Sequence, residues 1–167
     1  ADIVPDALPA ALAGAPIAVI DHTALPTEIA ARCDGLRDVV FLGTGARSYM
    51  DPEALASIGI TVHLIKGYGD TAVAECAIGL LFDAARKFAA MDRAMRDGRW
   101  LRSEGTQLAG KTLGLIGYGG IAAEVARMAL GIGMKVIAWN RSPKAAAAGV
   151  EFVAIERLLA ESDAVSL

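Results

Sequence analysis

Two cysteines, Cys33 and Cys76, are all that the 167-residue sequence contains. They are too few and too far apart for a disulfide framework or a clustered metal site, which favours two reduced thiols inside helices and a cytoplasmic setting. The formal net charge is -3, and the sequence contains no cluster of lysines and arginines. Both facts argue against nucleic acid as the main partner and against a polycationic surface for membranes. Its uncharged apolar runs are short and broken by proline or glycine, so neither a membrane span nor a signal peptide is predicted.

Short apolar runs alternate with helix-like stretches in the first part of the chain. The runs PIAVID (16–21), DVVFL (38–42) and ITVHL (60–64) have the length of buried strands. The clearest helix begins after Asp51, which can cap it, has Pro52 at its first position and ends near Gly59. Residues 1–68 are therefore predicted to form a small lobe with a parallel sheet.

A long amphipathic helix is predicted over residues 71–96, because apolar side chains recur there every three or four residues and Gly98 can end it. This pattern favours a helix that faces a core, and the same helix could also serve in a dimer. Strands are expected near 112–117, 135–139, 150–153 and 163–167, with helices between them and a short helix over Ala145–Ala148. Residues 69–167 are thus predicted to be α/β, with the first half of a Rossmann-like doubly wound parallel sheet.

The sequence GYGGIA, residues 117–122, has the glycine spacing of a dinucleotide-binding loop. Gly117 allows a tight turn, Gly119 lets the main chain approach a diphosphate, and Ala122 keeps the following helix close to the sheet. The N-terminus of that helix presents free N–H groups and the positive end of its dipole to the phosphates. Glycines also serve simple turns, but this set follows a strand, opens a helix and precedes a second strand, which favours a nucleotide site. We expect the contacts to come from Gly117, Tyr118, Gly119, Gly120 and Ile121.

The second strand of this part ends on Asn140 and Arg141, where NAD-binding proteins carry an acid that holds the ribose hydroxyls. Asn140 removes the repulsion that an acid would exert on a 2'-phosphate, while Arg141, Ser142 and Lys144 supply two cations and a hydroxyl. The pattern predicts NADP(H) as the cofactor, with NAD as the alternative. In the other interpretation, Arg141 is an ordinary solvated residue after a strand.

Two stretches carry a resemblance to a known family. LAGKTLGLIGYGGIA (108–122) and GYGDTAVAECAIGLLFDAARK (67–87) together resemble the D-isomer-specific 2-hydroxyacid dehydrogenases, and the likeness covers about residues 17–167. The resemblance implies a flavodoxin-like substrate lobe and a coenzyme lobe that flank a cleft, and it implies a homodimer. It also implies an NAD(P)-dependent oxidoreductase that exchanges a hydride with a small D-2-hydroxy acid or 2-oxo acid, as glyoxylate and hydroxypyruvate reductases do.

The resemblance assigns roles by position. It places Thr44, Gly45 and Ala46 in the loop whose main-chain N–H groups hold the substrate carboxylate, and it places Val73 near the nicotinamide. The family also uses a catalytic Arg, Glu and His, which no residue of this sequence matches; neither His22 nor His63 fits the acid/base motif. We therefore expect the chain to be part of a longer enzyme and to be inactive by itself, and the uncovered edge that strand 163–167 would leave agrees with this expectation.

Two other functions stay open on the sequence. A nucleotide-sensing regulator of the same fold would need an exposed groove for a partner protein. A dehydrogenase of the 3-hydroxyisobutyrate or 6-phosphogluconate type would fit the segment WNRSPK (139–144), although in those families the glycine motif opens the chain. Turnover by the full-length protein would separate an enzyme from a sensor.

Overall fold

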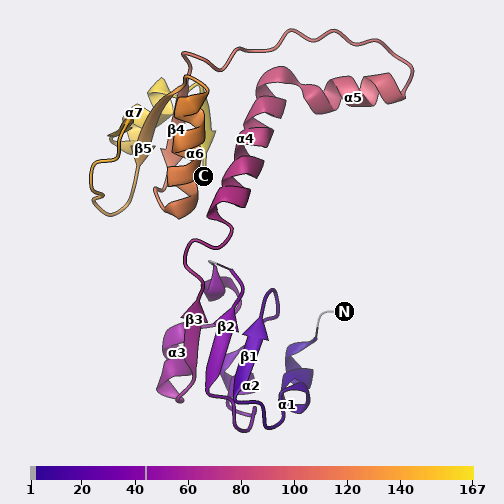
Figure 1. Cartoon of the computed structure of the whole chain (residues 1–167), viewed down its shortest axis with the longest axis vertical. Coiled ribbons are helices and arrows are strands. Elements are labelled where there is room, and N and C mark those ends of the chain that lie inside the picture. The colour runs from indigo at the N-terminus through magenta and orange to yellow at the C-terminus, as the bar shows by residue number, and fades with distance from the viewer. Residues whose placement is uncertain (1–2, 44) are drawn as a thin grey trace. The chain divides into compact units, whose positions relative to one another are not determined.

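The computed structural model describes residues 3–43 and 45–167 and divides the chain into two compact units, Ala1–Gly69 and Asp70–Leu167 (Figure 1). Each unit has its own parallel sheet and its own hydrophobic core. This confirms the predicted α/β class with parallel strands. Among the described residues, no helix combines the length and the apolar character that crossing a membrane requires.

The first unit is built on three parallel strands in the order β1-β2-β3, which are Ile17–Ile20, Asp38–Phe41 and Thr61–Leu64. Helix α2 (Thr27–Ala30) connects the first two strands, and the short 3-10 helix η2 (Ala46–Ser48) and helix α3 (Pro52–Ser57) connect the last two. The 3-10 helix η1 (Pro5–Ala7) and helix α1 (Leu8–Ala11) precede them. All three strands lie where the apolar runs predicted them.

The cap of α3 also forms as predicted. The Asp51 carboxylate accepts hydrogen bonds from the N–H groups of Glu53 and Ala54, at 3.0 and 3.1 Å. The Ala54 N–H is the main cause that holds the pKa of this carboxyl below its ordinary value. Gly59 follows the helix with a φ of 85°, a conformation that favours glycine and ends the helix.

The second unit carries a four-stranded parallel sheet in the order β6-β5-β4-β7. Its strands are β4 (Thr112–Ile116), β5 (Lys135–Trp139), β6 (Val150–Phe152) and β7 (Ala164–Ser166). Its helices are α4 (Asp70–Arg86), α5 (Phe88–Arg96), α6 (Gly120–Gly131) and α7 (Ile155–Glu161). Numbered within this unit, the strand order is 3-2-1-4, which matches four strands of the doubly wound order 3-2-1-4-5-6.

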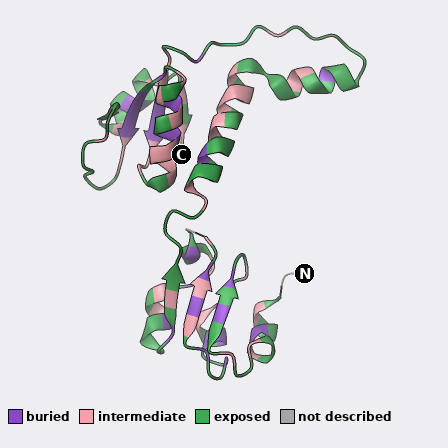
Figure 2. Ribbon diagram, viewed as in Figure 1, coloured by how far each residue is buried: buried purple, intermediate pink, exposed green. Residues whose placement is uncertain are grey.

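Buried positions gather along β4 and β5 (Figure 2). Leu113 and Leu115 of β4 pack in one core with Val125 and Ala129 of α6, and Ala74 of α4 belongs to the same core. Helix α7 packs on β4 at Gly114, next to the fully buried Leu158. The sheet is therefore covered by α6 and α4 in one core and approached by α7 at Gly114.

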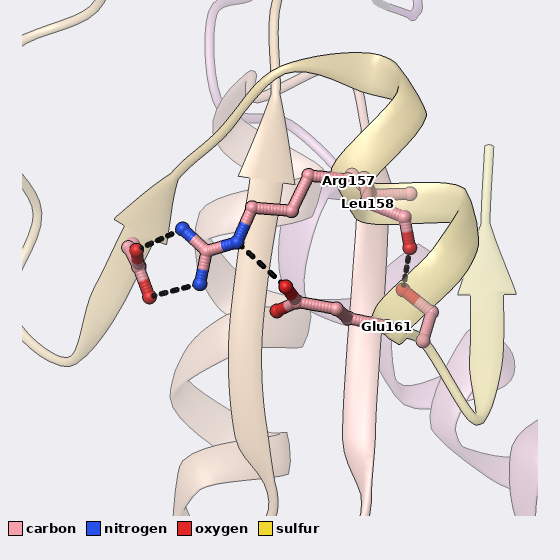
Figure 3. Close-up of polar contacts among 5 residues, drawn as sticks. Arg157, Leu158 and Glu161 are labelled. Carbon is pink, nitrogen blue, oxygen red and sulfur yellow. Dashed lines mark hydrogen bonds and ion pairs between the residues drawn. The ribbon is translucent and has the colours of Figure 1, made fainter.

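Arg157 ties helix α7 to the edge strand β6 (Figure 3). Its guanidinium donates to Glu151 of β6 at 2.5 Å and to Glu161 of its own helix at 2.8 Å. The bond to Glu161 is the largest cause that raises the pKa of Arg157, and the same bond lowers the pKa of Glu161. The three side chains are about half exposed, so these ion pairs contribute little to the free energy of unfolding.

The predicted single helix over residues 71–96 is wrong in one respect, because the structure breaks it at Lys87. Helix α4 ends at Arg86, Lys87 adopts a left-handed φ of 59°, and α5 begins at Phe88. The Asp83 carboxylate accepts the Ala89 N–H at 2.7 Å and so satisfies a free donor in the first turn of the new helix. Apolar spacing cannot reveal such a break, because it depends on one side chain that turns back to the main chain.

Two smaller expectations also fail. Ala145–Ala148 form no helix; Ala147 pairs with Val150 in an isolated bridge, and Gly149 closes the turn with a φ of 76°. Four alanines are too few to form a helix without packing or caps. Cys33 is free and buried but follows α2 instead of lying inside a helix, whereas Cys76 is free and exposed within α4.

Candidate functional site

The glycine loop between β4 and α6 has the backbone that its sequence predicts. Gly117 has a φ of 94°, which non-glycine residues rarely adopt, and its N–H donates to the Trp139 carbonyl of β5 at 2.8 Å. The turn therefore lies at the carboxyl ends of β4 and β5. Ligands of open α/β sheets bind at this edge.

Gly119 precedes α6 in extended backbone, with φ -107° and ψ -163°. A Cβ atom at this position would have no neighbour within 4 Å, so open space lies where the main chain would meet a diphosphate. Helix α6 has 12 residues, which is long enough for its free N–H groups and dipole to attract an anion. Shape and charge at this position fit a diphosphate.

The side chains of Tyr118 and Ile121 are partly buried against the core of the second unit. The Tyr118 ring meets Phe152 edge-on, with ring centroids 5.1 Å apart, and Ile121 packs against the core.

Gly120, the first residue of α6, touches the carboxylate of Asp70, the first residue of α4. The contact is so close that a Cβ atom on Gly120 would collide with Asp70. Sequence reasoning missed Asp70 because nothing in the pattern shows that α4 begins against the start of α6. Val73, one turn further along α4, is 49% exposed and lies in the same unit as the glycine loop.

Asn140 connects the glycine loop to the segment that follows β5. Its Oδ1 accepts the Tyr118 N–H at 3.0 Å, and its Nδ2 donates to the Ser142 carbonyl at 2.7 Å. Arg141, Ser142 and Lys144 are exposed next to it. Neither Arg141 nor Lys144 forms an ion pair with another described residue, so neither charge is neutralised by a described carboxylate.

The predicted carboxylate-binding loop lies in the first unit, after β2. Thr44 is outside the described residues. Gly45 precedes η2 as its N-cap, with φ -107° and ψ 44°, and Ala46 is buried. Among the described loop and turn hydrogen bonds, none is donated by the main-chain N–H groups of Gly45 and Ala46. The neighbouring Arg47 forms an ion pair with Glu53.

Each histidine pairs with an aspartate. His22 Nδ1 lies 2.8 Å from Asp21 Oδ2, and His63 Nε2 lies 2.7 Å from Asp38 Oδ1. All four side chains are at least 40% exposed. Within the described ranges, no three His, Cys, Asp or Glu side chains gather closely enough to hold a metal ion.

Comparison with known proteins places this geometry in a family. Residues 78–167 match the sequence model of the D-isomer specific 2-hydroxyacid dehydrogenase, NAD binding domain. The chain belongs to the D-isomer-specific 2-hydroxyacid dehydrogenase family. This confirms the resemblance read from the sequence, and residues 78–167 correspond to the family's NAD-binding domain.

A curated relative and two solved structures are similar to this chain. A hydroxypyruvate reductase of Thermotoga maritima is 35% identical over 153 residues, which are 90% of this chain and 50% of the relative. The crystal structure of a protein from Thermus thermophilus superposes with a TM-score of 0.89 at 32% identity and covers 100% of this chain and 55% of that one. An acyclic imino acid reductase, solved in complex with NADPH and D-Arg, superposes with a TM-score of 0.88 at 30% identity over 99% of this chain and 54% of that one. The chain thus spans about half the length of these three proteins.

Proposed function

We propose that this chain belongs to an oxidoreductase that transfers a hydride between NADP(H) and a small D-2-hydroxy acid or 2-oxo acid. The observation that carries the proposal is the glycine loop, whose open space at Gly119 fits a diphosphate. Similarity to a hydroxypyruvate reductase supports the substrate class. The activity is proposed for the whole protein, because the 167 residues span only about half the length of the relatives.

In this proposal the second unit binds the coenzyme and the first unit binds the substrate. Main-chain N–H groups of Gly117–Ile121 bind and orient the coenzyme, and Val73 lies against the nicotinamide. In the first unit, Thr44, Gly45 and Ala46 hold the substrate carboxylate by hydrogen bonds to an anion, which are stronger than those to a neutral group. When bound, the nicotinamide supplies or accepts the hydride. The catalytic Arg, Glu and His that the resemblance implies match no residue of this sequence.

NADP(H) is the proposed coenzyme because the end of β5 carries cations and no acid. Arg141 and Lys144 are exposed and unpaired among the described residues, and Ser142 adds a hydroxyl. A guanidinium recognises phosphate with two parallel hydrogen bonds. A relative of similar fold is described as a complex with NADPH, which agrees with this choice.

One binding experiment tests both parts of the proposal. We expect the wild-type chain to bind NADPH at least tenfold more tightly than NADH, a difference of about 1.4 kcal/mol. Gly119→Ala should weaken both coenzymes more than tenfold, because the methyl group occupies the space of the diphosphate. The free protein should melt at an unchanged temperature, because that space is open and the backbone suits alanine. Arg141→Ala should weaken NADPH alone.

Calorimetric titration of the three proteins decides the outcome. If Gly119→Ala binds NADPH as the wild type does, the glycines serve only the turn. If the wild type prefers NADH and Arg141→Ala leaves that ratio unchanged, the proposed role of the end of β5 is wrong.

We also propose a homodimer, as the family resemblance implies. Large apolar side chains are exposed along α4, α5 and the segment after them, namely Leu80, Phe88, Met95 and Trp100. A second copy of the chain could cover them, and the molar mass in solution tests this.

The free thiols of Cys33 and Cys76 favour a cytoplasmic location.

A nucleotide-sensing regulator of the same fold is the second candidate. It would use the same glycine loop, so coenzyme binding does not distinguish the two functions. Steady reduction of glyoxylate or hydroxypyruvate by the full-length protein would favour the enzyme.

A further inference from the structure

Asn140 forms two hydrogen bonds that fix the orientation of its amide. The Tyr118 N–H can only donate, so the atom 3.0 Å away must be the amide oxygen. The Ser142 carbonyl can only accept, so the atom 2.7 Å away must be the amide nitrogen. An asparagine satisfies both partners at once, whereas an aspartate of the same shape satisfies only the first.

The two partners belong to the two parts of the expected coenzyme site. Tyr118 lies between Gly117 and Gly119 of the loop that faces the diphosphate, and its ring is fixed against Phe152. Ser142 directly follows Arg141. One side chain therefore ties the diphosphate loop to the segment that carries the cations.

We infer that Asn140 is a positioning residue for recognition of the 2'-phosphate. Its Nδ2–H fixes the main chain at Ser142 and so holds the Arg141 guanidinium beside the adenosine ribose. The inference rests on the proposed preference for NADP(H) and gives it a structural cause. An acid at this position would lose the donor and would also place a negative charge against the Ser142 carbonyl oxygen.

A simpler account makes a different prediction. If Asn140 mattered only because it is not an acid, any neutral side chain would preserve the preference for the 2'-phosphate. If Asn140 positions Arg141, a neutral side chain without the amide would lose much of it. Leucine has nearly the shape of asparagine and neither donor nor acceptor, so Asn140→Leu separates the two accounts.

The test uses calorimetric titration with 2',5'-ADP and 5'-AMP, which differ only in the 2'-phosphate. The proteins are the wild-type 167-residue chain, Asn140→Leu, Asn140→Ala and Asn140→Asp, with Arg141→Ala as the comparison that removes the cation itself. The readout is the ratio of the two dissociation constants, because a loss of general structure would weaken both ligands equally.

We expect Asn140→Leu and Asn140→Ala to reduce the preference for 2',5'-ADP at least fivefold, and Asn140→Asp to reduce it further. Should one neutral variant fail to fold, the other still gives the ratio. An unchanged ratio in a folded neutral variant overturns the inference, and so does equal weakening of both ligands. A wild-type ratio near one contradicts the preference for NADP(H) itself, which separates that failure from failure of the positioning role.

Discussion

Gly114 lies in the middle of β4, where helix α7 crosses the strand. A Cβ atom at this position would come within 2.7 Å of Leu158 Cδ2 and would collide with the Ser162 hydroxyl. Leu158 is fully buried, and the Ser162 hydroxyl is bound to the Leu158 carbonyl at 2.6 Å. Neither neighbour can move without disturbing the packing of α7.

Gly114→Ala is therefore expected to destabilise the second unit by about 1–3 kcal/mol, the usual cost of overpacking a core. The matched control is Gly131→Ala at the end of α6, where a Cβ atom would have no neighbour within 4 Å. Alanine suits a helix better than glycine, so the control should gain roughly 0.5 kcal/mol. Urea unfolding followed by tryptophan fluorescence measures both, because Trp100 and Trp139 lie in the second unit. Equal effects of the two substitutions would contradict the packing argument.

Sequence reasoning at the residue scale succeeds where the backbone alone decides. The left-handed φ of Gly117 and the open space at Gly119 follow from the spacing of the glycine loop. The amide bridge of Asn140 and the contact of Asp70 with Gly120 could not be foreseen, because each depends on where a side chain turns in space. The sequence showed only that position 140 carries no acid. The structure shows that the Asn140 amide forms hydrogen bonds to Tyr118 and Ser142.

At the scale of elements, Asp163 joins the beginnings of β4 and β7. Its carboxylate accepts the Thr112 N–H at 2.8 Å and pairs with the Lys111 ammonium at 3.0 Å, while its own N–H donates to the Thr112 carbonyl at 2.9 Å. The Thr112 N–H, with Lys111 as a smaller cause, holds the pKa of Asp163 below its ordinary value. The ionised carboxylate thus favours the folded second unit.

The sign of the pH dependence follows from that lowered pKa. The contribution of Asp163 is fully present above the pKa of an unfolded aspartate, about 4, and is lost as the pH falls through the lower folded pKa. Asp163→Asn should therefore lower the melting temperature at pH 7, and its difference from the wild type should shrink below about pH 4. Because the Thr112 N–H is the larger cause, Lys111→Ala should keep most of the wild-type pH dependence. Melting curves between pH 7 and pH 3 measure this, and a difference that stays constant over the range would refute the linkage.

The elements show which patterns determine secondary structure. The seven strands among the described residues all follow from apolar runs bounded by turn residues, including the edge strand β3, which is mostly exposed. The break at Lys87 escaped the same reasoning, since α4 and α5 keep apolar residues at helical spacing on both sides of it. The alanine cluster Ala145–Ala148 gave the opposite error, a predicted helix that does not form, because helix propensity without packing does not form a helix.

At the scale of the whole molecule, the chain holds two hydrophobic cores with no residue in common. One contains buried residues between Leu8 and Ile60, and the other contains buried residues between Ala74 and Ala138. Alternation of strands and helices predicted both sheets, and the family resemblance suggested a substrate and a coenzyme role for them. The match of residues 78–167 to the family's NAD-binding domain supports the coenzyme role of the second unit, and the substrate role of the first unit stays a prediction.

Separate cores predict separate responses to a ligand. Both tryptophans, Trp100 and Trp139, lie in the second unit, so tryptophan fluorescence reports on that unit alone. Circular dichroism reports on the helices and strands of both units. A coenzyme that binds only the folded second unit stabilises it by mass action, by about 2.7 kcal/mol at a concentration 100 times its dissociation constant.

NADPH should therefore raise the melting temperature seen by fluorescence by several degrees and leave the transition of the first unit in place. Circular dichroism should then resolve two phases, of which only one moves with NADPH. Gly119→Ala supplies the control, because it should melt like the wild type without coenzyme and show a clearly smaller shift with it. If both probes instead report one transition that moves as a whole, the two units unfold as a single cooperative body, and the independence of their cores is refuted.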